Sequence, residues 1–430
     1  MGLSAYGGIK VRNKTMIMRR LAVILAIACI YSEANAIGKN YRPIEIPLGP
    51  FDLRPILEVS ESYNDNIFFN NNLRKSSMLT QVRSGFQLAL KRKLNSYAFN
   101  YAFQSQQYHS SPQDNYVDQY IGGQAHVEFT RRNRLDIEAS FVDGHYRRGT
   151  TFSQGVVGIQ SIKEPNAFHN ISAHARYRYG GVKAKGNLEL AVDFDDLEFT
   201  NNPQQTRGWD RTDITITPGF FYRVFPKTHA LIQLEQTFVD YKNNNVPGVA
   251  NSDYTKQRYL LGVSWDYSAK TQGKARFGYL RQVLDASDTQ PASGFSWDVA
   301  LLWKPKPYSQ LGFSFNRDVR PTFGFGSGRL IESYRSTWIH DWNSRISTGL
   351  TGAYLNVDNR GSGRHDDIIG VGFNANYNLG KWLGVGINYS YLDQDSTSNN
   401  LDFYQNVIMF YIAANSAISK SMPTPWQDWY

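Results

Sequence analysis

Apolar and polar side chains alternate along almost the whole chain. From residue 54 to residue 413, segments of about ten to fifteen residues carry an apolar side chain at every second position. Phe99, Tyr101 and Phe103, for example, alternate with Asn100 and Gln104. A period of two is that of a β-strand whose two faces meet different surroundings. The pattern therefore predicts an all-β fold with one apolar and one polar face.

Eighteen segments carry this alternation. We predict strands near 55–63, 77–90, 96–108, 118–130, 135–147, 167–179, 183–198, 211–224, 230–241, 254–267, 274–284, 294–304, 310–317, 331–342, 346–357, 367–379, 383–392 and 403–413. Eight short connections alternate with nine longer ones. Short turns on one side and long loops on the other are typical of bacterial transmembrane barrels, which have an even number of strands. The sequence therefore predicts a transmembrane antiparallel up-and-down β-barrel of 18 strands over residues 55–413, with short periplasmic turns and longer extracellular loops.

The polar face separates this prediction from a secreted β-sandwich, which also alternates. A second packed face would be apolar, whereas this one is rich in charged and amide side chains, as a water-filled lumen is. A mean hydropathy of −0.46 also excludes a bundle of spanning helices. The candidate lumen-lining residues are Arg83, Asn100, Gln104, Gln124, Arg176, Arg178, Arg223, Arg258, Arg276, Asp298, Arg335, Asn374 and Asn376.

Aromatic residues gather near the predicted strand ends. Such residues form girdles at the two membrane–water interfaces of a barrel. The candidate girdle residues are Tyr146, Tyr222, Trp265, Tyr267, Trp303, Trp338, Trp342 and Trp382. They support the membrane barrel over the sandwich.

The start of the chain resembles a secretory signal. An apolar run over 21–31 follows Arg19 and Arg20 and precedes Ala34-Asn35-Ala36, so residues 1–36 are expected to be a signal peptide cleaved after Ala36. The barrel is then expected in the outer membrane of a Gram-negative bacterium. Proline-containing segments over 37–54 and 414–430 are expected to be a periplasmic extension and a periplasmic tail.

Charge differs between the two kinds of connection. The eight short turns hold many basic residues and no acidic ones, while the long loops carry most of the acids. The predicted periplasmic basic rim includes Lys91, Arg92, Lys93, Arg131, Arg132, Arg134, Lys304 and Lys306. Anionic lipid headgroups of the inner leaflet are the first expected partner, and an anionic polymer that collects at the pore mouth is the second.

A short motif at the first strand carries a family resemblance. The chain reads Glu58-Val59-Ser60-Glu61-Ser62-Tyr63-Asn64-Asp65-Asn66-Ile67-Phe68. This resembles the "putative β-barrel porin 2" family, whose members often open with an acidic, serine-rich strand that runs into Tyr-x-Asp-Asn-Ile/Val-Phe. Members of that family are often encoded beside genes for exopolysaccharide or capsule synthesis. The resemblance implies a polysaccharide as transported partner and a periplasmic export protein as a possible second partner.

No pattern of residues predicts an enzyme or a metal site. His109 and Ser111 share a strand face but sit at a loop edge, without a third group placed to orient the histidine. Asp193, Asp195 and Asp196 lack the ligand spacing of a calcium loop. No cofactor and no nucleic-acid partner is predicted.

We therefore expect a non-enzymatic channel, most readily the exit pore for an exopolysaccharide or capsular polysaccharide. A general diffusion porin for small solutes is the first alternative. A structural or plugged barrel is the second, in which inward charges pair across the lumen, for example Arg258 with Asp298.

Overall fold

The protein is described by a computed structural model that covers residues 44–243, 253–266, 270–285, 291–321 and 328–415. The predicted signal peptide at 1–36 and the predicted tail beyond residue 415 lie outside these ranges. Within them, no helix is long and apolar enough to cross a bilayer.

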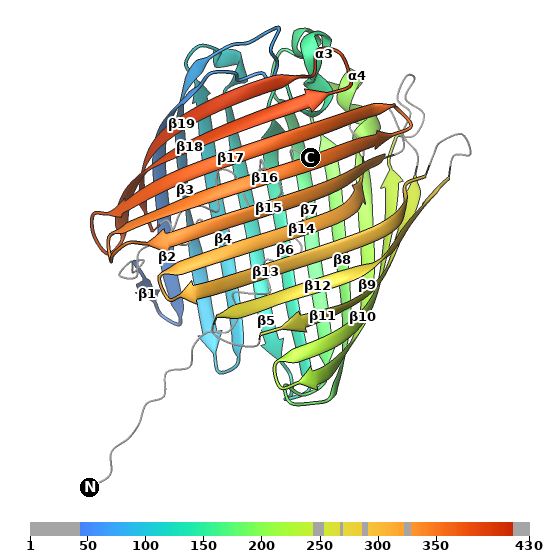
Figure 1. Ribbon diagram of the computed structural model, residues 1–430. Coiled ribbons are helices and arrows are strands. Elements are labelled where there is room, and N and C mark those ends of the chain that lie inside the picture. The colour runs from blue at the N-terminus through green and yellow to red at the C-terminus, as the bar shows by residue number, and fades with distance from the viewer. Residues whose placement is uncertain (1–43, 244–252, 267–269, 286–290, 322–327, 416–430) are drawn as a thin grey trace.

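Eighteen antiparallel strands close into one barrel (Figure 1). Each strand pairs with its neighbours in sequence, and β19 pairs with β2 to close the cylinder. The strands are β2 (Phe51–Asn64), β3 (Ser77–Arg92), β4 (Asn95–Tyr108), β5 (Tyr116–Glu128), β6 (Asn133–Tyr146), β7 (Asn166–Tyr179), β8 (Gly186–Phe199), β9 (Arg211–Phe225), β10 (Thr228–Tyr241), β11 (Tyr254–Trp265), β12 (Thr271–Leu284), β13 (Ser293–Lys306), β14 (Ser309–Arg320), β15 (Gly328–Asp341), β16 (Ile346–Arg360), β17 (Arg364–Asn378), β18 (Leu383–Ser396) and β19 (Phe403–Ala414). The predicted fold class and strand number are confirmed.

The barrel begins earlier than the predicted residue 55. β2 starts at Phe51, and a short strand β1 (Ile46–Leu48) pairs with its first residues, so part of the predicted 37–54 extension belongs to the sheet. Pro55 is tolerated inside β2 because its carbonyl accepts a hydrogen bond from Asn415, on the side of β19, which ends at Ala414. The backbone nitrogen of a strand residue points the same way as its carbonyl. The missing N–H of Pro55 therefore costs no ladder bond with β3.

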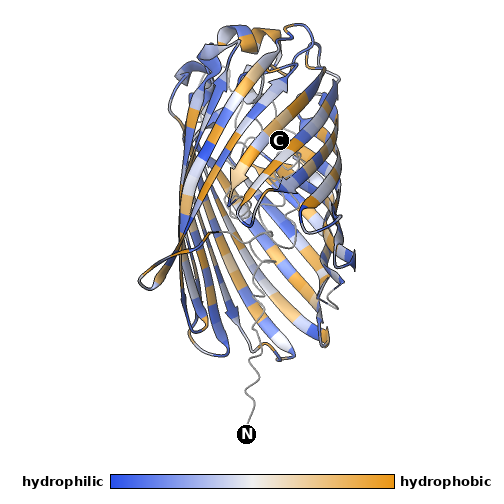
Figure 2. Cartoon of the chain, turned by 90° about the vertical axis from the view of Figure 1, so that its left-hand side faces the viewer, coloured by the Kyte–Doolittle hydropathy of each residue, from blue (hydrophilic) through white to orange (hydrophobic). Residues whose placement is uncertain are grey.

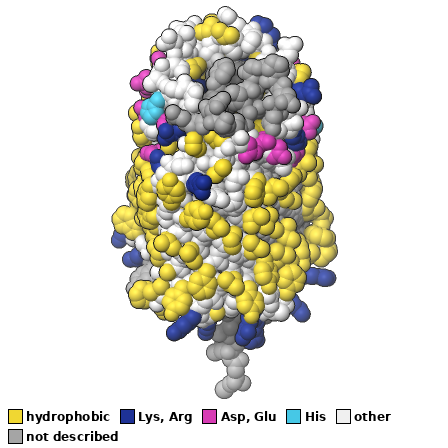
Figure 3. Space-filling view, turned by 90° about the vertical axis from the view of Figure 1, so that its right-hand side faces the viewer, with side chains coloured by type: hydrophobic (Ala, Val, Ile, Leu, Met, Phe, Trp, Pro, Cys, Tyr) yellow, Lys and Arg dark blue, Asp and Glu magenta, His cyan; other side chains and the backbone are white. Residues whose placement is uncertain are grey.

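Hydrophilic and hydrophobic residues alternate along the strands (Figure 2), so the two faces of the sheet have opposite character. Along β17, Ile369, Val371 and Phe373 are exposed, while Asn374 and Asn376, at positions of the opposite parity, are buried. Exposed Val, Ile, Leu, Phe and Tyr side chains cover the middle of the outer surface, and Lys and Arg gather at one end of it (Figure 3). An apolar band on the outside and polar side chains on the inside match a barrel that sits in lipid.

The even-numbered strands from β2 to β18 run toward one end of the barrel, called the loop end, and the odd-numbered strands from β3 to β19 run toward the other, called the turn end (Figure 1). Loop L1 (residues 65–76), loop L3 (147–165), loop L4 (200–210) and loop L9 (397–402) lie at the loop end. L3 contains the helix α3 (Gly155–Ser161), and L4 contains α4 (Pro203–Thr206). The connection predicted at 358–366 is shorter than expected, because β16 and β17 continue to Arg360 and from Arg364.

Candidate functional site

The thirteen candidate lumen residues lie on the strand face opposite the exposed apolar side chains. Nine of them are buried: Arg83, Asn100, Gln104, Arg176, Arg258, Arg276, Arg335, Asn374 and Asn376. The other four, Gln124, Arg178, Arg223 and Asp298, are half-buried. All thirteen therefore share the inner face of the barrel, which includes a charged wall and a neutral wall.

The charged wall is densest on β10 to β14. Lys256 of β11 reaches Asp318 of β14, with its Nζ 3.1 Å from the carboxylate. β12 and β13 lie between these two strands. Side chains converge only on the concave side of a curved sheet, so this contact lies inside the barrel. The predicted pairing of Arg258 with Asp298 is wrong. Arg258 instead donates to Glu235 at 3.2 Å and to Ser296 at 3.1 Å.

Asp298 is held by a different arginine. Asp298 lies directly opposite Arg276 across the β12–β13 ladder, and the two side chains are hydrogen-bonded. The register between β12 and β13 explains why Asp298 pairs with Arg276 and not with Arg258. Residues directly opposite each other on neighbouring strands share a face of the sheet at the shortest cross-strand distance. These ion pairs run along the wall between near neighbours and do not cross the lumen.

A second charged group occupies β5 to β8. Arg178 donates to Asp136 at 2.9 Å and lies 3.4 Å from Glu189. His174 lies 2.7 Å from Asp193. The charged wall thus extends from β5 to β14, with acids and bases closely interleaved.

The inner face of β16 to β19 has a different chemistry. Below the loop end it presents only small, amide and hydroxyl side chains on β16, β17 and β18, here called the neutral wall: Ser347, Gly349, Thr351, Ala353, Gly370, Gly372, Asn374, Asn376, Gly384, Gly386, Asn388 and Ser390. Asn374 and Asn388 face each other across the ladder. Asn374 Nδ2, Asn388 Oδ1 and Thr351 Oγ1 have no hydrogen-bond partner within the described ranges. The wall therefore retains hydrogen-bonding capacity.

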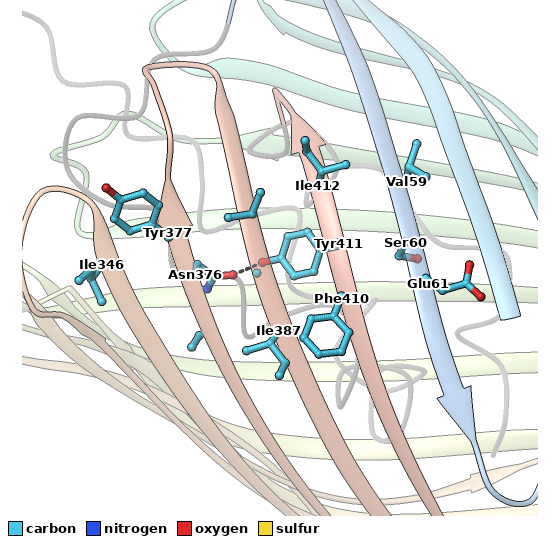
Figure 4. A pocket seen from close by; sticks show the side chains of 13 residues that line it. Val59, Ser60, Glu61, Ile346, Asn376, Tyr377, Ile387, Phe410, Tyr411 and Ile412 are labelled. Carbon is cyan, nitrogen blue, oxygen red and sulfur yellow. Dashed lines mark hydrogen bonds between the residues drawn. The ribbon is translucent and has the colours of Figure 1, made fainter. Parts of the chain in front are cut away.

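The neutral wall adjoins a groove of about 720 Å³ beside the β19–β2 seam (Figure 4). Tyr411 of β19 points toward Asn376 of β17 and donates a hydrogen bond to it, as the dashed line shows. Most of the groove's other lining residues, such as Ile387, Phe410 and Ile412, are apolar. Asn376 and Tyr411 thus form a polar contact next to an apolar groove.

The polarity of the two faces reverses near the loop end. On β8, Leu197 and Phe199 are buried while Glu198 between them is exposed. Leu197 and Phe199 pack in one cluster with Phe168 of β7 and with Val239 and Tyr241 of β10, and the cluster also contains Tyr146, Trp209 and Tyr254. An apolar inside and a charged outside indicate that these strand ends project beyond the lipid into water. This layer was not predicted, and the expectation that Tyr146 belongs to an interfacial girdle is wrong.

A second apolar cluster occupies the mouth beside β15 to β19. Phe69 of loop L1 packs against Phe403 at a ring-centroid distance of 5.4 Å. The cluster also contains Ile331, Ala353, Leu355, Val357, Ile368 and Leu392, which are buried side chains of β15 to β18. Loop L1 therefore folds inward against the inner face.

Loop L3, the longest connection in the sequence, also packs at the mouth. Its Ile159 is 4% exposed and joins Ile67 and Phe68 of loop L1 in a third cluster. Arg148 makes a buried two-point contact with Asp114, at 2.5 and 2.7 Å. These contacts fold L3 inward against the mouth of the barrel.

Loop L4 covers the mouth beside β7 to β11. Trp209 is 4% exposed and stacks edge-on against Tyr241. The carboxylate of Asp210 accepts a hydrogen bond from the backbone N–H of Phe199 at 2.8 Å. Burial raises the pKa of Asp210, although this backbone bond opposes the rise. L1, L3 and L4 together bring α3 and α4 over the loop end (Figure 1).

The basic residues of the predicted rim lie at the turn end. Lys91, Arg92, Lys93, Arg131, Arg132, Lys304 and Lys306 are exposed. Arg134 differs: it is the second residue of β6, lies half-buried on the inner face and donates to the carbonyl of Gly180. The rim is therefore a ring of exposed cations without Arg134.

The residues considered for catalysis have other contacts. His109 Nε2 lies 2.8 Å from Thr80 Oγ1, and Ser111 donates to Asp114 at 2.6 Å, so His109 and Ser111 are engaged separately. Asp196 pairs with Lys242 at 2.8 Å. Within the described ranges, no group of three or more His, Cys, Asp or Glu residues is placed to hold a metal ion.

Three solved structures illustrate the likeness of fold. The chain matches the FrpB iron transporter from Neisseria meningitidis with a TM-score of 0.43 and 11% identity, covering 81% of this chain but only 63% of the transporter. It matches OccK5 (OpdH) of Pseudomonas aeruginosa with a TM-score of 0.44 and 12% identity, covering 84% of this chain and 98% of OccK5. It matches a bacterial polysaccharide outer membrane secretin with a TM-score of 0.37 and 7% identity, covering 84% of this chain and 97% of the secretin.

No curated protein sequence matches this chain. A family model does: the one described as "Putative beta-barrel porin 2" matches residues 39–415, which include every strand of the barrel. The closed 18-stranded barrel, its lipid-facing apolar band and this match agree with one another. The chain is thus an outer-membrane β-barrel that belongs to the putative beta-barrel porin 2 family.

Proposed function

We propose that this barrel is the outer-membrane exit pore for an exopolysaccharide or capsular polysaccharide. The neutral wall is the observation that carries the proposal. Its amide and hydroxyl groups match the donors and acceptors of sugar hydroxyls, and many weak contacts let a chain slide where a few strong ones would hold it. β8 lies nine strands from β17, half of the 18-stranded ring, so the part of the charged wall on β5 to β8 faces the neutral wall across the lumen.

The basic rim fits the same proposal at the periplasmic side. Exposed Lys and Arg side chains at the turn end raise the local concentration of an anionic polymer near the entrance. A periplasmic export protein that hands the polymer over would meet this end of the barrel. Anionic phospholipid headgroups are a competing partner for the same cations.

Deletion of the gene tests the proposed function. We expect surface polysaccharide to fall, polymer to accumulate inside the cell envelope, and uptake of small sugars to stay at its normal rate. Complementation with the wild-type gene restores the surface polymer. Unchanged polymer together with slower uptake of small solutes would refute the exporter and support a diffusion porin.

Variants of the neutral wall sharpen the test. Complementation with N374L/N388L, which keeps side-chain size but removes both amides, is expected to restore less than half of the surface polymer. The matched control is F373L, because Phe373 neighbours Asn374 but is exposed on the lipid-facing side. Equal restoration by the two variants would contradict a role for the neutral wall.

A diffusion porin for small solutes is the second candidate. The specific observation in its favour is the facing arrangement of charged and neutral walls, which sets up an electric field across the lumen that orients small polar solutes. Steady conductance of the purified protein in planar bilayers, together with normal surface polymer in the deletion strain, would favour this candidate.

A further inference from the structure

The motif over residues 58–68 ends in loop L1, and the structure shows what its last residues build. Asn64 Oδ1 accepts a hydrogen bond from the backbone N–H of Asn66 at 2.8 Å. Asn66 Oδ1 accepts one from Asn70 at 3.2 Å, and Asn70 Oδ1 accepts two more from the following backbone. Successive asparagine side chains thus replace the ladder bonds that a strand would provide. The motif shapes a loop that turns into the barrel.

The turned loop presents three consecutive apolar residues to the mouth. Ile67, Phe68 and Phe69 are 3%, 8% and 5% exposed. Ile67 and Phe68 join the cluster beside β3 to β5, whereas Phe69 joins the cluster beside β15 to β19. Loop L1 therefore connects two apolar surfaces of the inner wall that would otherwise face an open mouth.

Loop L3 holds loop L1 from above. The guanidinium of Arg148 lies 4.7 Å from the centre of the Phe68 ring, within cation–π range. Gly149, with a φ of 86°, approaches the Phe68 backbone so closely that an added Cβ would come within 2.0 Å of its carbonyl oxygen. Gln154 accepts a hydrogen bond from Arg364 of β17 at 2.8 Å, so L3 reaches from β6 to β17. Arg148 and Asp114 anchor L3 in this position.

Two features favour a displaceable closure over a permanent plug. Phe69 has a φ of 51°, and a left-handed conformation of a bulky non-glycine residue is strained. The bonds that tie L1 to loop L9 and to β19 are polar, and water can replace them: Asn70 to the carbonyl of Asn400 at 2.7 Å, Asn72 to the side chain of Asn400 at 2.7 Å, and Gln405 to the carbonyl of Asn66 at 2.6 Å. Strain and polar ties of this kind lower the cost of moving L1 while the barrel ladder stays intact.

We propose that loop L1 is a gate at the loop end of this channel. Ile67, Phe68 and Phe69 form its closing surface, the asparagines of the family motif fix its closed shape, and Arg148 with Asp114 forms the latch that holds it. In the closed state the apolar residues exclude water and ions from the mouth, as hydrophobic constrictions do in channels. Passage of a solute or polymer requires L1 to leave the mouth.

Planar-bilayer recordings of the full-length barrel test the gate. We expect wild-type protein to stay mostly in a low-conductance state and F69A to spend at least tenfold more time in a high-conductance state. The matched control is F99A, which removes the same ring from the exposed lipid-facing side and leaves the conductance unchanged. R148Q, which removes the latch, is expected to shift the open time in the same direction as F69A, and it serves as the second opening variant if F69A does not fold.

A reversible cross-link separates gating from a general disturbance. N72C/N400C joins L1 to L9 where the two side chains are bonded, and Cys29, the single cysteine of the sequence, is changed to serine. In the F69A or R148Q background, a short bis-methanethiosulfonate linker is expected to abolish the high-conductance state, and a reducing agent to restore it. Folded opening variants that conduct like wild type, or openings that persist after cross-linking, would overturn the gate.

Discussion

Tyr411 of β19 lies across the α-carbon of Gly386 on β18 and donates a hydrogen bond to Asn376 of β17. A Cβ at Gly386 would come within 2.4 Å of the Tyr411 ring and hydroxyl. The glycine therefore leaves the space in which one side chain joins three strands next to the seam that closes the barrel. This contact ties β19, the last strand of the barrel, to the two strands that precede it in sequence.

Filling the space at Gly386 is expected to break this contact. G386A should push the Tyr411 side chain away from Asn376 and lower the free energy of unfolding by about 1 kcal/mol, the usual net contribution of one hydrogen bond. Y411F removes the same bond without a clash, so the double variant should lose little more than either single one. Urea unfolding of the barrel in lipid vesicles measures all three.

The control for Gly386 is its neighbour on the same face of β18. A Cβ at Gly384 would meet its nearest atom, Asn378 Oδ1, only at 3.5 Å, an ordinary contact. G384A should therefore unfold at the same urea concentration as wild type. A loss in G384A as large as that in G386A would show that β18 needs glycine for its backbone and not for Tyr411.

The arginine at the centre of the charged wall should be costly to remove alone. Arg258 is 2% exposed and bonds Glu235 and Ser296. R258M removes the buried guanidinium from beside the Glu235 carboxylate, and breaking a buried pair in this way costs about 3–5 kcal/mol. Adding E235Q should recover part of the loss, since it removes one of the negative charges that Arg258 balances. R281M, on the exposed Arg281 of β12, is the control and should change the unfolding free energy by less than about 0.5 kcal/mol.

Much of the fold could be predicted from the sequence because strand faces are a local property. A side chain at Asn374 points away from one at Phe373 whatever the rest of the chain does, and repetition of that rule over eighteen segments fixes the count. Strand boundaries are not a local property where a proline, which lacks an N–H, lies in the sequence. At Pro55 the decisive fact was where β19 ends, which is not a local property.

The loop-end layer was missed although the sequence contains a signal for it. On β8 the exposed apolar residues are Leu188, Leu190 and Val192, but the buried ones at the strand end are Leu197 and Phe199. The apolar residues of β8 thus stand at even positions within the lipid and at odd positions beyond it. The alternation changes phase where the strand leaves the lipid. The sequence contains no such signal for the ion pairs of the charged wall. The register between neighbouring strands decides that Arg276, and not Arg258, meets Asp298.

The change of phase on β8 makes a direct prediction. F199A removes a buried ring from the loop-end layer and should cost about 3–5 kcal/mol of unfolding free energy, as in other packed cores. E198A changes an exposed outward residue and should be neutral. Urea titration in lipid vesicles compares the two. If the lipid band reached this level of β8, E198A would instead stabilise the barrel and F199A would have little effect.

The exposed cations of the turn end are expected to speed the insertion of the barrel into anionic membranes, whatever substrate it carries. Each Lys or Arg beside an anionic surface contributes about 1 kcal/mol of attraction. K91Q/R92Q/K93Q is therefore expected to insert at least tenfold more slowly than wild type into vesicles that contain phosphatidylglycerol, and equally fast into vesicles of phosphatidylcholine alone. The matched control, K163Q/R207Q/R360Q, removes three cations from the loop end and should keep the wild-type rate in both. Because salt screens only the anionic case, raising the ionic strength should erase the difference between the two triple variants. A difference that survives high salt would mean that residues 91–93 act through the shape of the β3–β4 turn and not through their charge.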